Sequence, residues 1–218
     1  MTHYQLAIGA RMAGTAELQL PLQPLESVIW IDSTPNSLEL RGTMLTAHKL
    51  AEIGVRIDRA SEWFPSIDSA MNEFGINTPA RQAAFIAQIL HESGMLRYTV
   101  ELWGPTAAQL RYEGRRDLGN TQPGDGPRFK GRGLLQTTGR SNYKMTGEAL
   151  GVDLVNHPEL LSTPEYAARS AGWYWKRNRL NALADSGDFR LLTRRINGGY
   201  NGYDERLALW NKAKEVLA

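Results

Sequence analysis

The spacing of the hydrophobic residues predicts a helix over residues 79–92. Four residues at positions i, i+3, i+4 and i+7 share one face of this helix: Phe85, Gln88, Ile89 and Glu92. Thr78 can cap the start of the helix, and Pro79 suits its first turn. Gly94 is expected to end the helix. Glu92 therefore lies at the C-terminal end of a mostly apolar helix face.

The same helical spacing recurs along most of the chain after residue 43. We expect further helices after Thr46, over residues 58–64, between Pro65 and Gly75, from about Pro164, over residues 188–196 and from about Asp204. Pro65 separates two of them in this interpretation, because proline removes a hydrogen bond from a helix interior. Residues 95–133 are rich in glycine and proline and predict a long loop, and such loops are commonly functional.

Residues 1–44 show a different pattern. Residues 16–22 alternate between apolar and polar side chains, and residues 27–31 and 37–40 are also typical of short strands. We therefore expect a short β-rich N-terminal arm at residues 1–44 and a mainly α-helical domain with long loops at residues 45–218. The pattern leaves the role of the arm open between a leader, a partner-binding element and a segment that packs against the domain.

The composition excludes several classes of protein. The chain has 218 residues, enough for one domain with a real core, and no cysteine, which excludes disulfides and thiolate chemistry. No apolar run could span a bilayer, and the N-terminus lacks the order of a signal peptide, so we expect synthesis in the cytoplasm. The formal net charge of +2 does not indicate nucleic-acid binding.

Several chemistries fit the sequence poorly. The His91-Glu92 pair lacks the second histidine of a zinc protease, so we expect no metal and no cofactor. No Gly-x-Ser-x-Gly elbow occurs for a serine nucleophile. Gly131 and Gly133 lack the third glycine of a dinucleotide-binding loop. A basic trio could bind phosphate or form structural ion pairs: Arg128, Lys130 and Arg132.

Hydrolysis of a glycosidic bond by two carboxyl groups fits better. Glu92 is the candidate acid, because apolar surroundings and the negative end of the helix dipole both disfavour its ionised form. A carboxyl group that is protonated near neutral pH can act as a general acid. Glu101 and Glu113 follow in the loop as candidates for the ionised base. The pattern alone leaves open that all three are ordinary exposed charges.

Several separate motifs within residues 45–218 resemble glycoside hydrolase family 19, and within it the endolysins of phages and bacteria. The matching segments are Trp63-Phe64-Pro65, residues 70–76, Phe85–Gln88 with His91–Gly94, Pro123–Gly126, Gly131–Gln136, Asn142-Tyr143 and Ile196–Gly199. The resemblance implies a lysozyme-like (chitinase-type) helical fold. It does not extend to residues 1–44.

The resemblance also implies catalytic roles. Glu92 matches the general acid and Glu101 the general base, with Glu113 as the alternative base. Thr138 matches a hydroxyl that helps to hold the attacking water. The family inverts the anomeric carbon, which implies that the two carboxyl groups lie about 6.5–9.5 Å apart.

Further residues match positions that contact the substrate. Gln136 and Asn142 match residues that hydrogen-bond sugar amides and hydroxyls, while Asn197 and Arg206 match a helper pair near the base and the substrate. Four aromatic residues could stack on sugar rings, with core packing as the equal alternative: Trp103, Tyr112, Phe129 and Tyr143.

These implications lead us to expect a monomeric endolysin that cleaves β-1,4 bonds of peptidoglycan by the inverting two-carboxylate mechanism. It would act on the cell wall in the periplasm, after release through a membrane hole of the holin type or delivery by a machine. A chitinase is the alternative substrate assignment. The sequence also allows a non-catalytic cell-wall-binding protein on the same scaffold, or an interaction protein that works through residues 1–44.

Overall fold

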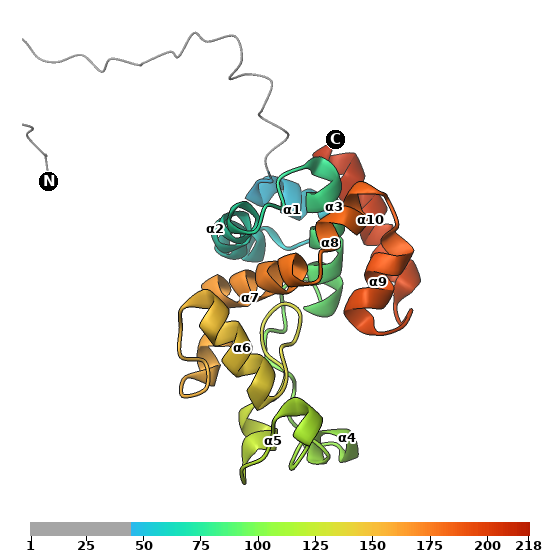
Figure 1. Cartoon of the computed structure of the whole chain (residues 1–218). Helices are drawn as coiled ribbons and strands as arrows, with labels where there is room; N and C mark the ends of the chain where they lie inside the picture. The colour runs from blue at the N-terminus through green and yellow to red at the C-terminus, as the bar shows by residue number, and fades with distance from the viewer. Residues whose placement is uncertain (1–44) are drawn as a thin grey trace, which may run out of the picture. The chain divides into compact units, whose positions relative to one another are not determined.

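The structure, a computed structural model, describes residues 45–218 and shows a mainly α-helical unit (Figure 1). Its α-helices are α1 (Ala47–Ile53), α2 (Ile57–Glu73), α3 (Pro79–Glu92), α4 (Ala107–Leu110), α5 (Asp125–Arg128), α6 (Arg140–Leu150), α7 (Pro164–Arg177), α8 (Leu180–Asp185), α9 (Phe189–Asn197) and α10 (Tyr203–Leu217). Two 3-10 helices, η1 (Arg116–Leu118) and η2 (Pro158–Ser162), lie in the connections. The predicted mainly helical fold is confirmed for these residues, whereas the predicted β-rich arm at residues 1–44 lies outside them.

Helix α3 lies in the main hydrophobic core. Every residue from Gln82 to Leu90 is buried, so α3 is enclosed on all sides and not on one face alone. Helices α10 and α8 pack against α3, while α2 packs against both α1 and α7. Phe85 meets Trp175 of α7 edge to face, with their ring centroids 5.2 Å apart. This burial fixes the C-terminal end of α3, where Glu92 lies.

Two helices begin where the sequence predicts. Thr46 Oγ1 accepts a hydrogen bond from the backbone N–H of Lys49 at 3.1 Å, which caps α1. Thr78 Oγ1 accepts one from the backbone N–H of Arg81 at 3.3 Å, and Pro79 follows as the first residue of α3. Both starts depend on contacts within four residues, which is why the sequence pattern reveals them.

The prediction that Pro65 separates two helices is wrong, because α2 is continuous from Ile57 to Glu73. Pro65 is exposed, and so is Ser61, whose carbonyl group loses its helical partner and remains open to water. Buried residues continue the same helix face on both sides of Pro65: Ala60, Trp63, Ile67, Ala70 and Met71. Burial of each large apolar side chain stabilises the fold by about 1.5–3 kcal/mol. The sum over this helix face exceeds the roughly 3 kcal/mol that a proline costs in a helix interior.

The loop-rich part of the chain has a smaller core of its own. Four buried residues form it: Phe129, Tyr143, Leu154 and Leu161. The first residue of α6, Arg140, donates to both carboxylate oxygens of the buried Asp125, at 2.5 and 2.9 Å. Figure 1 shows α4 and α5 at the far end of the unit from α1. Neither α6 nor the short α8 was predicted from the sequence.

Candidate active site

A groove lies where the main helical core meets the loop-rich part of the unit. Its volume is about 280 Å³. The lining residues come from η1, the loop before α6, α6 itself, α7 and α9: Leu118, Leu135, Gln136, Thr137, Thr138, Asn142, Thr146, Trp173, Tyr174, Arg177 and Ile196. Three of these residues, Gln136, Thr138 and Asn142, are predicted site residues, which identifies this groove as the candidate site.

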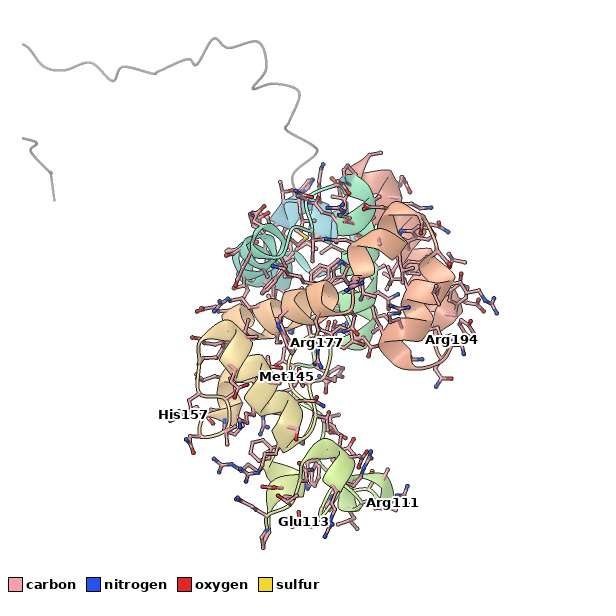
Figure 2. All side chains as sticks on the ribbon, viewed as in Figure 1. Arg111, Glu113, Met145, His157, Arg177 and Arg194 are labelled. Atoms are coloured by element: carbon pink, nitrogen blue, oxygen red, sulfur yellow. The ribbon has the colours of Figure 1, made fainter. Side chains whose placement is uncertain are left out.

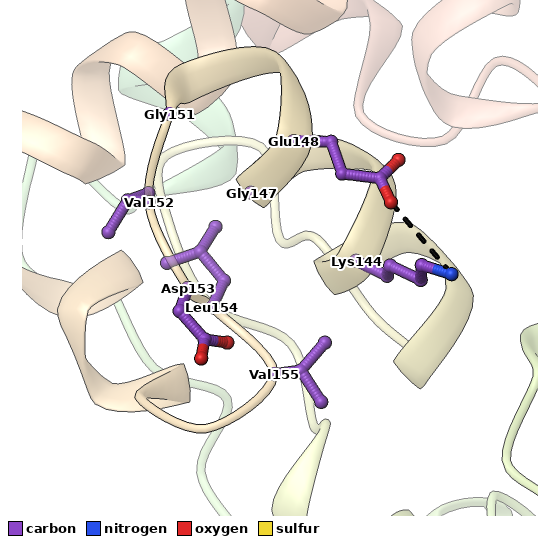
Figure 3. A pocket seen from close by; sticks show the side chains of 8 residues that line it. All are labelled: Lys144, Gly147, Glu148, Gly151, Val152, Asp153, Leu154 and Val155. Carbon is purple, nitrogen blue, oxygen red and sulfur yellow. Dashed lines mark ion pairs between the residues drawn. The ribbon is translucent and has the colours of Figure 1, made fainter.

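A larger hollow of about 540 Å³ lies between the C-terminal half of α6 and the segment that follows it (Figure 3). Lys144 and Glu148 form an ion pair of 3.8 Å at its rim. None of the predicted site residues lines this hollow. The smaller groove is therefore the better candidate.

Glu92, the last residue of α3, meets an arginine. Its Oε1 accepts a hydrogen bond from Arg206 Nη2 at 2.5 Å, and the Glu92 side chain is 22% exposed. Arg206 Nη1 also donates to Gln88 Oε1 at 2.5 Å, and Gln88 Nε2 donates to Thr193 Oγ1 at 2.9 Å. A buried polar chain from α9 and α10 thus holds the candidate acid in place.

This arrangement corrects two predictions. The surroundings of Glu92 are not purely apolar, because a guanidinium group lies against one carboxylate oxygen. The side chain of Arg206 is only 2% exposed and bonded to Gln88 and Glu92, so it cannot contact a substrate directly. The two residues of the ion pair are 114 positions apart, and no local pattern could reveal their contact.

The charge of Glu92 acts on Tyr174, a residue that lines the groove. Burial raises the pKa of the Tyr174 hydroxyl, and the nearby charge of Glu92 raises it further. Tyr174 lines the groove and donates its hydroxyl hydrogen to the backbone oxygen of Arg195 at 3.1 Å. Glu92 therefore lies close to the wall that α7 contributes.

Three donors hold the carboxylate of Glu101. Oε1 accepts hydrogen bonds from Gln109 Nε2 at 2.9 Å and from the Tyr112 hydroxyl at 3.3 Å. Oε2 accepts one from the backbone N–H of Gly131 at 3.0 Å. A half-buried carboxylate with partners on both oxygens has little freedom to rotate.

Gly131 is the point at which the predicted residues meet. A Cβ atom added there would lie 3.3 Å from both Glu101 Oε2 and Thr138 Oγ1, and 2.7 Å from Gln136 Oε1. The structure thus brings the candidate base together with two groove residues, and only glycine leaves room for all three. Thr138 donates to the backbone oxygen of Gln136 at 3.0 Å, and Asn142 donates to that of Thr138 at 2.7 Å.

Glu113, the alternative base, has a different position. Its Oε1 accepts a hydrogen bond from the backbone N–H of Gly124 at 2.7 Å, and its Oε2 accepts one from Gly126 at 2.9 Å. Both contacts hold the start of the short helix α5. We therefore retain Glu101 as the candidate base and assign Glu113 to the loop structure.

Tyr143 does not reach the substrate, contrary to the prediction that it binds there. It is completely buried against Phe129, with ring centroids 5.2 Å apart. Its hydroxyl donates to the backbone oxygen of Lys130 at 2.6 Å and accepts from Arg132 at 2.9 Å. Burial raises the pKa of Tyr143 to about 12. The alternative of core packing applies to Tyr143 and Phe129.

The remaining predicted side chains are not among the residues that line the groove. Asn197 ends α9 beside Ile196, and its Nδ2 lies 3.5 Å from the backbone oxygen of Asn201. Trp103 and Tyr112 lie near Glu101, with ring centroids 6.1 Å apart. In the basic trio, Arg128 and Arg132 donate to backbone oxygens, and Lys130 Nζ lies 5.9 Å from the centroid of the Trp103 ring. These contacts favour a structural role for the trio.

Several residues of the site were not predicted from the sequence. They are the supporting donors Gln109 and Gly131, the buried Thr193, and the α7 side chains Trp173, Tyr174 and Arg177. Gln88 shares the helix face of Glu92, but the sequence pattern gives it no role. A glutamine one turn before an acid on an otherwise apolar face is a usable signal, because a buried amide needs partners. Within residues 45–218, no three potential metal ligands cluster, and no helix is long and apolar enough to cross a membrane.

The chain matches the protein family described as chitinase class I over residues 59–184. A glycosyl hydrolase family 19 domain-containing protein of Haemophilus influenzae is 31% identical, over 67% of this chain and 85% of that protein. An endochitinase of Arabidopsis thaliana is 36% identical over 54% of this chain, but the match covers only 39% of the plant protein.

Solved structures share the fold. Chitinase C from Streptomyces griseus HUT6037 aligns with a TM-score of 0.66 and 22% identity, over 81% of this chain and 94% of that chain. A class IV chitinase from Zea mays aligns with a TM-score of 0.53 and 22% identity, over 80% and 82%. With the sequence matches, these likenesses show that the chain belongs to glycoside hydrolase family 19 and is a glycoside hydrolase with the chitinase-type fold.

Proposed function

We propose that this chain cleaves β-1,4 glycosidic bonds of peptidoglycan with inversion, using Glu92 as general acid and Glu101 as general base. The observation that carries the proposal is the position of two carboxylates beside one groove. The charge of Glu92 acts on Tyr174, and Glu101 meets Gln136 and Thr138 around Gly131. Tyr174, Gln136 and Thr138 line the groove.

Glu92 has one oxygen available for a proton. Arg206 binds Oε1, whereas Oε2 has no hydrogen bond within residues 45–218. A proton on Oε2 can pass to the leaving glycosidic oxygen. Arg206 stabilises the carboxylate both before Glu92 takes up a proton and after it has given the proton to the leaving oxygen.

Glu101 can activate the attacking water. Oε1 is occupied by two donors, but Oε2 accepts only the Gly131 N–H among residues 45–218 and keeps a free lone pair. Thr138 Oγ1 and Glu101 Oε2 would each lie 3.3 Å from a Cβ atom added at Gly131. Thr138 uses its own hydrogen to bind Gln136, so its oxygen can accept a hydrogen bond from the same water. One water held by both groups would attack the anomeric carbon from the face opposite Glu92.

Two side-chain amides suit an N-acetylated sugar. Gln136 Nε2 donates to the backbone oxygen of Gly133 at 2.9 Å, and Asn142 Nδ2 donates to that of Thr138. Each amide is thereby oriented with its oxygen available as an acceptor. Acceptors in the groove can bind the amide N–H and hydroxyl groups of N-acetylglucosamine units, which peptidoglycan and chitin share.

Chitin is the second candidate substrate, because the plant and bacterial proteins similar to this chain are named as chitinases. Peptidoglycan lies outside the cytoplasmic membrane, so our first choice also requires the chain to reach the wall. We propose release through a membrane hole or delivery by a machine.

Mass spectrometry and rapid anomer analysis of the products from purified peptidoglycan and from chitin oligomers test this proposal. We expect peptidoglycan fragments cut at the β-1,4 bond, with the α-anomer formed first and ¹⁸O from labelled water at the new reducing end. Cleavage of chitin oligomers alone would contradict the substrate assignment. A β-anomer as the first product would contradict the mechanism.

A further inference from the structure

One side chain gives the groove its charge. Among the residues that line the groove, Arg177 at the C-terminal end of α7 is the only one with a formal charge. The side chain is exposed, and its guanidinium carbon lies 5.2 Å from the centroid of the Trp173 ring. Arg177 forms no ion pair with any carboxylate in residues 45–218. Figure 2 labels it where α7 ends.

The arginine near the N-terminal half of α7 behaves differently. Arg169 donates to both carboxylate oxygens of Glu73, at 2.8 and 2.9 Å. Arg81, which is also partly exposed, forms the same two-pronged contact with Asp185, at 2.8 and 2.7 Å. Carboxylates thus hold Arg81 and Arg169, whereas Arg177, the charged residue of the groove, has no carboxylate partner among the described residues.

A second unpaired arginine lies close by. Arg195 on α9 is exposed and has no carboxylate partner among the described residues. Its charge and that of Arg177 both act on the Tyr174 hydroxyl and lower its pKa, against the effects of burial and Glu92. The charges of Arg177 and Arg195 thus act on the same groove residue, while Glu92, whose charge also acts there, is already engaged by Arg206.

We propose that Arg177, supported by Arg195, binds a carboxylate carried by the glycan and so selects anionic strands over neutral ones. This inference rests on the proposed glycan hydrolase function and names the residue that would determine its substrate. The lactyl-peptide substituents of peptidoglycan carry carboxylates, whereas chitin carries none. The catalytic groups act on the sugar unit that both polymers share, so the choice between them must come from a contact outside that unit.

The geometry of Arg177 suits this role. A guanidinium that rests on an aromatic ring loses part of its freedom before the ligand arrives, and it offers two parallel N–H groups to a carboxylate. Such charge-assisted contacts are stronger than neutral ones and specific for planar anions. Because the site is open to water, we expect a contribution of about tenfold in kcat/KM, larger at low salt than at high salt.

Arg177→Gln tests the inference, with Lys176→Gln as the matched control. Lys176 is the preceding exposed cation on α7 and does not line the groove. The substrates are soluble glycan strands with free peptide carboxylates, the same strands after amidation of those carboxylates, and a neutral N-acetylglucosamine hexamer. Binding of each substrate is measured by calorimetry alongside kcat/KM, and circular dichroism confirms that both variants fold.

We expect Arg177→Gln to lower the ratio of kcat/KM on anionic strands to kcat/KM on amidated strands about tenfold, mainly through KM. Lys176→Gln should leave the ratio unchanged. An equal loss on all three substrates, or unchanged binding of anionic strands, would overturn the role of Arg177 whether or not the strands are cleaved. Failure of the wild-type chain to cleave any peptidoglycan strand, with binding still dependent on Arg177, would overturn the proposed function alone.

Discussion

The ion pair between Glu92 and Arg206 makes a specific prediction about stability. Replacing Arg206 with methionine removes the donor to Glu92 Oε1 and the donor to Gln88 Oε1 in one step. Methionine fills similar space, so the loss is chiefly electrostatic. Removing one partner of a buried ion pair costs about 3–5 kcal/mol, because the other charge stays behind without a partner.

The expected cost for Arg206→Met is near the lower end of that range, about 3 kcal/mol. The Glu92 side chain is 22% exposed, so water can partly replace the lost guanidinium. The free energy of unfolding is measured by urea denaturation at pH 7. Lys212→Met on the same helix is the control, because Lys212 pairs with Glu215 on the surface and such pairs contribute at most about 1 kcal/mol.

A double-mutant cycle separates the pair from other effects. If Arg206 acts through Glu92, the variant that combines Arg206→Met with Glu92→Gln should be more stable than the sum of the single losses predicts, by at least about 1 kcal/mol. A loss below about 1 kcal/mol for Arg206→Met alone would refute this reasoning. Strict additivity in the cycle would show that Arg206 stabilises the fold without pairing with Glu92.

Three other predictions concern the groove and the loop-rich part. Gly131→Ala should lower kcat/KM about 100-fold, because the new methyl group displaces groups around the base, whereas Gly199→Ala has open space and should not. The hydrogen bond from Arg140 holds the pKa of Asp125 below its usual value. The ionised Asp125 therefore stabilises the fold at neutral pH, and this stabilisation is lost as the pH falls below about 4. Chemical denaturation should show that the wild type loses more stability than Asp125→Asn over that range. Tyr143→Phe should cost about 1–3 kcal/mol in unfolding free energy with little change in KM, since the hydroxyl bonds to Lys130 and Arg132 of the protein itself. A large rise in KM would show that Tyr143 contacts the substrate.

Local sequence patterns predicted the parts of the fold that depend on neighbouring residues. The caps at Thr46 and Thr78 each involve a residue three positions away, and both helices begin as expected. The break at Pro65 was predicted by the same local logic and is wrong, because burial of residues on both sides of the proline keeps α2 continuous. The rule that proline interrupts a helix does not take into account the free energy gained when the rest of α2 is buried.

The candidate site depended more heavily on contacts between distant residues. The resemblance supplied Glu92, Glu101 and three groove residues, Gln136, Thr138 and Asn142, but it could not supply the orientation of the side chains. Arg206 was expected at the substrate and lies behind Glu92 instead, because the start of α10 packs against the end of α3. The structural role of Glu113 also could not be predicted from the sequence, because the groups that donate to its carboxylate are backbone N–H groups more than ten residues away.

The central claim is that Glu92 and Glu101 divide the work of acid and base. The most direct test compares turnover of soluble peptidoglycan strands by Glu92→Gln, Glu101→Gln and Glu113→Gln, each shown to be folded. We predict losses of at least about 100-fold for the first two variants, as expected for removal of a general acid or base, and a much smaller loss for the third. Turnover retained by Glu92→Gln, or a greater loss in Glu113→Gln than in Glu101→Gln, would contradict the account.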